Sequence, residues 1–257
     1  MIEVVLEYKL FNFIPLTFKR EIPQEWSQLT SKQMEFAAKV FYAKITDAKL
    51  VQVLLRIPGF VAKKLHPFHI FSLVEHLDFL YEFKARDSFA IPEMGDGVAP
   101  QPRLKGVTFG HFIYIDSYFQ QYSEHYVPLI MDKFLAALYL PKGQKFDEND
   151  IDRRAKIMAK ESYYKKQAVL INYRLFREWL HIRYHLVFPK KEESKTQGKE
   201  PKKKLSNPKA ALGSWVKIFD ALVGDDIANS HKYENMPLHQ ALRYIQDNIK
   251  KNAKRKV

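Results

Sequence analysis

The fold is decided by three neighbouring segments, TFGHFIYIDSYFQQY (108–122), VPLIMDKFLAALYLPKGQKF (127–146) and WLHIRYHLVFP (179–189). Apolar residues recur in them every three to four positions, which is the period of an amphipathic helix. Thr108 is a good N-cap, and Pro128 suits the first turn of a helix. The segments therefore predict consecutive helices that share one core.

The chain before these segments is also mostly helical in pattern. Residues 1–20 are the exception, because they mix β-prone residues with imperfect alternation and predict a short β element. Thr30, followed three positions later by Gln33, has the spacing of a capping box and predicts a helix start. The other predicted elements are helices over 47–56 and 67–81 and a long surface loop over 84–106.

The composition changes after Pro189. Residues 190–206 are rich in Lys, Glu and Ser, and they predict a basic, disordered linker. Apolar stripes within 207–250 predict a pair of helices, followed by a basic tail at 251–257. Two such helices expose too much apolar surface to stand alone, so we expect them to dock on the body or on another protein. The predicted fold class is mainly α: a helical bundle-like body over 1–189, a short N-terminal β element and a tethered C-terminal helical pair.

Length and composition limit the class of protein. The 257 residues, 46% of them hydrophobic, suffice for a substantial core. The sequence contains no cysteine, which excludes disulfides and thiolate chemistry. The longest apolar run, Phe134–Leu140, is far shorter than the roughly 20 residues of a membrane-spanning helix. The N-terminal residues lack the pattern of a secretion signal. We therefore expect a protein without a membrane partner.

The net charge of +13 suggests nucleic acid as a partner, but the charge is unevenly placed. The linker 190–206 carries a net +4 and residues 250–257 carry a net +5, so the predicted folded body is only weakly basic. A groove that follows phosphates needs charge on the folded surface. Weak nucleic-acid contact through these Lys-rich segments therefore remains an alternative hypothesis.

Two polar groups suggest metal chemistry, and each has a simpler explanation. His181 and His185 have the helical spacing that points two imidazoles at one ion, but no third ligand is evident, so we expect a surface pair. The acidic group at 147–152 resembles a calcium loop, but it lacks the central Gly and the final Glu, so we expect helix capping.

The aromatic residues of 109–126 are dense enough to suggest base stacking, although their helical spacing favours a core. No glycine-rich phosphate loop and no GxSxG motif is present. We therefore predict no catalytic, cofactor-binding or metal-binding residue and a protein that is not an enzyme. A hydrolase assembled from scattered residues is the alternative.

Three stretches resemble a known family. They are EIPQEWSQLTSKQM (21–34), FGHFIYIDSYFQQY with FLAALYLPKGQKFD (109–122 and 134–147), and GSWVKIFDALVGD with MPLHQALRYIQDNI (213–225 and 236–249). The family comprises tail-module proteins of phages and prophages of Bacteroidetes-type hosts, and the last stretch is similar to tail-assembly-chaperone-like proteins. The resemblance implies a non-enzymatic assembly role, in the host cytoplasm or the virion, with the tape-measure protein or neighbouring tail proteins as partners.

Four residues of the predicted C-terminal pair are the candidate partner contacts: Trp215, Phe219, Leu238 and Leu242. The same residues would serve equally to dock the pair on its own body. Two other functions remain as alternatives to the assembly role. One is nucleic-acid binding through the Lys-rich segments, and the other is a structural connector or terminator that forms a ring.

Overall fold

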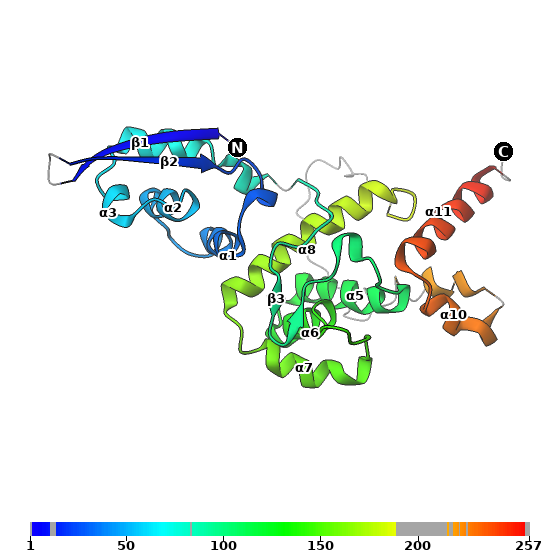
Figure 1. Ribbon diagram of the computed structural model, residues 1–257. Helices are drawn as coiled ribbons and strands as arrows, with labels where there is room; N and C mark the ends of the chain where they lie inside the picture. The colour runs from blue at the N-terminus through cyan, green and yellow to red at the C-terminus, as the bar shows by residue number, and fades with distance from the viewer. Residues whose placement is uncertain are drawn as a thin grey trace, which may run out of the picture. The chain divides into compact units, whose positions relative to one another are not determined.

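The computed structural model describes residues 2–10, 14–82, 84–188, 215, 218–220, 222–224 and 226–254 (Figure 1). Helices dominate the described chain, and its only sheets are two small antiparallel hairpins, so the predicted mainly α class is confirmed. The predicted linker 190–206 lies outside the described residues. None of the helices that the structure describes is long and apolar enough to cross a membrane.

The chain divides into two compact units, which differ from the predicted body of residues 1–189. Unit 1 comprises 1–86, 90–92 and 162–176, and unit 2 comprises 87–89, 93–161 and 177–257. The described part of the C-terminal helical pair therefore belongs to unit 2. Periodicity shows where a helix lies but not which helices share a core, so the sequence pattern does not give this division.

Unit 1 begins with a long hairpin. Its elements are β1 (Ile2–Leu10), β2 (Ile14–Ile22), η1 (Trp26–Gln28), α1 (Ser31–Val40), α2 (Asp47–Leu54), α3 (Gly59–Ala62), α4 (Pro67–Glu75), η2 (Asp78–Tyr81) and the first part of α8 (Tyr163–Arg183). The strands pair in register, with Leu6 opposite Phe18, and alternate residues along each strand point inward and outward. The two strands confirm the predicted β element and extend it to Ile22.

The helix starts of unit 1 follow the predicted signals. The Thr30 side chain accepts a hydrogen bond from the backbone N–H of Gln33, and the Gln33 side chain reaches back to Thr30, so the capping box is confirmed. Aromatic rings also pack against one another in unit 1. Trp26 stacks on Phe41 at a ring distance of 6.3 Å and meets Phe79 edge-on at 6.4 Å.

Unit 2 is built on an antiparallel pair of helices. Its elements are β3 (Glu93–Met94), β4 (Gly97–Val98), η3 (Pro102–Leu104), α5 (Phe109–His125), α6 (Pro128–Leu138), η4 (Glu148–Asp150), α7 (Ile151–Met158), the end of α8, η5 (Ile227–Asn229), α10 (Ser230–Glu234) and α11 (Leu238–Lys254). Trp215 and residues 218–220 and 222–223 are also helical. Figure 1 shows α5, α6 and α7 gathered side by side, in agreement with their contacts. The helix α11 continues to Lys254, into the stretch predicted as a basic tail at 251–257.

The predicted loop at 84–106 is partly ordered against unit 2. The strands β3 and β4 form a hairpin within it, and the Val98 N–H donates to the Leu140 carbonyl at 2.9 Å. Gly97 makes this close approach possible, because an added Cβ would collide with the Tyr139 carbonyl. Met94 and Leu104 are buried. The sequence pattern missed these contacts because single buried residues between turns have no period.

Candidate interaction surfaces

The four predicted partner contacts lie at the junction of the C-terminal helices with α5. The Trp215 ring meets Phe112 edge-on at 5.2 Å, and Phe219 stacks on Phe109 at 6.4 Å. Trp215, Leu238 and Leu242 are buried, and Phe219 is half-buried. These residues dock the C-terminal helices on their own unit, which is the second role that the sequence left open. Their role as partner contacts stays a prediction.

A buried carboxylate anchors this junction. Asp116 on α5 pairs through Oδ1 with the Arg177 Nε at 2.7 Å, and its Oδ2 accepts from the Trp215 Nε1–H at 2.8 Å. Only 1% of the Asp116 side chain is exposed, so both oxygens need partners to offset the loss of water. The sequence analysis overlooked Asp116, and the one signal was an acid in the middle of an apolar helix.

Backbone hydrogen bonds extend the same junction to α11. The Phe109 N–H donates to the Met236 carbonyl at 2.8 Å, and the Leu238 N–H donates to the Val107 carbonyl at 3.0 Å. His239 bridges the junction through its two ring nitrogens, which lie 2.6 Å from the Arg103 carbonyl and 2.8 Å from the Tyr184 hydroxyl. Burial lowers the pKa of His239, so the ring stays neutral and donates through Nε2–H.

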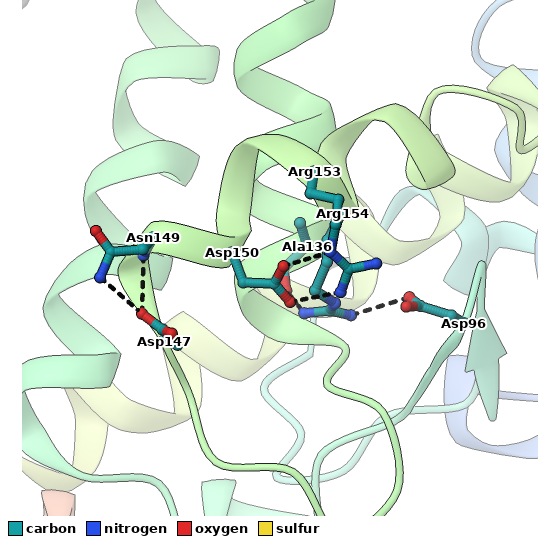
Figure 2. A network of polar contacts seen from close by, with 7 residues as sticks. All are labelled: Asp96, Ala136, Asp147, Asn149, Asp150, Arg153 and Arg154. Carbon is teal, nitrogen blue, oxygen red and sulfur yellow. Dashed lines mark hydrogen bonds and ion pairs between the residues drawn. The ribbon is translucent and has the colours of Figure 1, made fainter.

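The acidic group at 147–152 caps and pairs, as predicted (Figure 2). The Asp147 carboxylate accepts from the Asn149 backbone N–H at 2.9 Å, and Asp150 pairs with Arg153 at 2.5 and 2.7 Å. That pairing holds the pKa of the Asp150 carboxyl below its usual range. The described residues contain no cluster of three or more side chains suited to a metal ion.

Arg154 lies beside this group and has a different role. Its guanidinium donates to the Ala136 carbonyl and pairs with Asp96 at 3.2 Å (Figure 2). It also donates to the Tyr139 carbonyl. Ala136 is in the last turn of α6, where carbonyls lack helical partners. A buried cation there satisfies those carbonyls and complements the helix dipole, so Arg154 fixes α7 against the end of α6.

In the histidine pair, His181 is half-buried and His185 is exposed. The His181 ring stacks on Phe188 at 4.5 Å, and burial lowers its pKa. The aromatic segment 109–126 is mainly core, as its spacing favours. Its buried members are Phe109, Phe112, Phe119 and Tyr122. This segment therefore exposes few rings that could stack on bases.

A pocket lies in unit 2 at the N-terminal end of α5. Its volume is about 570 Å³, and its walls include Val98, Pro100, Leu140 and Phe146. His111 also lines it, stacked on Phe146 at 4.2 Å, and its Nε2 lies 2.7 Å from the Ala137 carbonyl. Burial lowers the pKa of His111 to about 4, so the ring is neutral at pH 7. We call this cavity the end pocket.

Exposed apolar side chains concentrate at two further places. On α4 of unit 1, Phe68 and Phe71 are 68% and 62% exposed. In unit 2, the turn between α5 and α6 exposes Tyr126, Val127 and Leu129. The sequence analysis singled out neither group, because spacing along the chain does not show which apolar side chains stay exposed after packing.

Comparison with known proteins gives no relative. No family model, no curated protein and no solved structure matches the chain.

Proposed function

We propose that the protein is a non-enzymatic assembly factor of a phage tail module that binds helical segments of the tape-measure protein or of a neighbouring tail protein. The resemblance of the sequence segments suggests the class, and the exposed side of α4 supports the mode of action. Phe68 and Phe71 define this α4 face. Because they lie three residues apart, they project from the same side of the helix.

The α4 face is unusual for a helix in a folded unit. Five of the nine residues of the helix α4 are apolar, yet Leu73 is the one residue of this helix that is buried. Burying an exposed Phe side chain contributes on the order of 1.5–3 kcal/mol, so a partner that covers both rings gains substantial free energy. Exposed aromatic residues of this kind mark sites of protein association.

The charges beside the α4 face indicate the chemistry of the partner. Lys63 and Lys64 are exposed in the turn before α4, and Glu75 is exposed at the end of the helix. An amphipathic helix with apolar side chains at positions i, i+3 and i+7 fits such a face, and acidic residues on its flank complement the two lysines. Long helical proteins such as the proposed partners supply segments of this kind.

The test is co-purification of the tagged protein with its neighbouring gene products at about 0.5 M salt, where electrostatic attraction is screened within roughly 4 Å. We expect a helical partner to be retained by the wild type and lost by the Phe68→Ser/Phe71→Ser variant. Tyr244→Asn, which removes an exposed aromatic ring of unit 2, is the control and should retain the partner. Equal retention by the wild type and the double variant contradicts the role of α4.

The same experiment distinguishes the nucleic-acid hypothesis from the assembly role. The described part of the Lys-rich segments is 250–254 at the end of α11, where Lys250 and Lys251 are exposed. Binding of any DNA at low salt, lost at about 0.5 M and unchanged in the Phe68→Ser/Phe71→Ser variant, favours that function instead.

A further inference from the structure

We propose that unit 2 associates head to tail with a second copy of this chain, the apolar turn between α5 and α6 of one copy entering the end pocket of the next. Tyr126, Val127 and Leu129 form this turn, which we call the apolar tip. The inference does not rest on the tail-assembly function, because it concerns unit 2 and a second copy.

The apolar tip has a conformation that its sequence does not favour. Tyr126 ends α5 in the left-handed region, with φ of 55°, and its N–H donates to the Tyr122 carbonyl at 2.8 Å. Gly or Asn is favoured at this cap, and a residue with a Cβ costs about 1–2 kcal/mol there. The Tyr126 side chain is nevertheless 71% exposed and Leu129 is 56% exposed. A strained position that presents a large apolar side chain to water suggests a binding role.

The end pocket has the size and lining to take such a tip. Its volume of about 570 Å³ falls in the range of preformed binding pockets, and a Tyr ring is smaller than that. Apolar side chains line it on more than one side, among them Val107, Leu138 and Pro141. An aromatic anchor in a pocket of this type is the usual centre of a small protein interface.

The tip and the pocket lie at opposite ends of the same pair of helices. Thr108 and His111, at the start of α5, line the pocket, and Leu138 lines it from the end of α6. The tip joins the other ends of these helices. The 17 residues of α5 span about 25 Å, so the tip of one copy cannot reach its own pocket. Two different surfaces at opposite ends of a rigid element produce head-to-tail association.

The charges around the two surfaces are complementary. Lys105 and Lys145 line the end pocket, and Glu124 lies two residues before the tip. Glu234 also lines the pocket, but its side chain packs over Gly110 at the start of α5. The two lysines therefore outnumber the acid and attract Glu124 of the incoming copy. The contact area is small, so we expect a dissociation constant on the order of 10–100 µM.

The test uses sedimentation velocity and mass-resolved size-exclusion chromatography of the full chain over concentrations that span about 5–300 µM. The wild type should grow in mean mass with concentration. The tip variant Tyr126→Asn/Leu129→Gln keeps a residue suited to the left-handed cap and should stay monomeric. The pocket variant Ala99→Trp fills the cavity and should also stay monomeric. Tyr244→Asn is the matched control and should behave as the wild type does.

Mixing the tip variant with the pocket variant tests whether the association is head to tail. Each variant keeps one intact surface, so an equimolar mixture of the tip and pocket variants should form a dimer and nothing larger. Lys145→Glu should weaken association about tenfold, and adding Glu124→Lys to the same chain should restore it. A wild type that stays monomeric throughout, a mixture that forms no dimer, or equal loss in Tyr244→Asn overturns the proposal. Retained self-association in the Phe68→Ser/Phe71→Ser variant shows that the two proposals are independent.

Discussion

Replacing the buried Asp116 by Asn should release the C-terminal helices from α5. The substitution keeps the shape of the side chain and an acceptor for the Trp215 N–H, but it removes the charge that Arg177 faces at 2.7 Å. Breaking a buried ion pair by removing one partner costs about 3–5 kcal/mol. Because 24% of the Arg177 side chain reaches solvent, we expect the lower end of that range, about 3 kcal/mol.

The assay is chemical denaturation of the full chain, combined with hydrogen exchange of the amides in α11. Asp116→Asn should lower the free energy of unfolding of unit 2. Amide exchange in α11 should be faster than in the wild type, whereas exchange in α6 should change less. The control is Asp152→Asn, which breaks the pair with Lys133 at 2.6 Å. Asp152 is 76% exposed, so this change should cost less than about 1 kcal/mol. Equal effects of the two substitutions would refute the anchoring role of Asp116.

Three further predictions test local features. Burial lowers the pKa of His111 to about 4, so the neutral ring contributes its full stability above pH 6.5, and this contribution is lost as the pH falls toward 4. His111→Gln should remove about 3 kcal/mol of this pH dependence, as measured by denaturation at several pH values. Gly97→Ala places a Cβ against the Tyr139 carbonyl and should lower the unfolding free energy by about 2 kcal/mol, seen in the denaturation midpoint. Thr30→Ala removes the cap of α1 and should cost about 1 kcal/mol in the same assay, whereas Thr30→Asn should cost less.

The local features of the fold could be predicted from the sequence. Thr30 begins α1, Thr108 begins α5 and Pro128 begins α6, because each signal acts on backbone groups within a few residues. Phe109, Phe112, Phe119 and Tyr122 were correctly assigned to the core for the same reason, since their period is visible along the chain, whereas Tyr126 of the same segment is exposed.

The tertiary arrangement could not be predicted in this way. The contact between Asp116 and Trp215 joins residues 99 positions apart, and no spacing rule connects them. The predicted partner contacts were therefore placed on a surface that the chain itself covers. The exposed Tyr126 was missed because a left-handed aromatic residue contradicts the usual cap rule, which is the only local rule that applies there.

The pairing of Val107 and Phe109 with residues 236–238 has a consequence for synthesis on the ribosome. The start of α5 can form these contacts only after a segment that is synthesised more than a hundred residues later. At about 5–20 residues per second, this interval lasts many seconds. During it, Phe109 and Phe112 lack the ring of Trp215, and Asp116 lacks one of its donors. Until the C-terminal helices are synthesised, the nascent chain therefore exposes apolar rings and a carboxylate on α5, and chaperones can bind this surface.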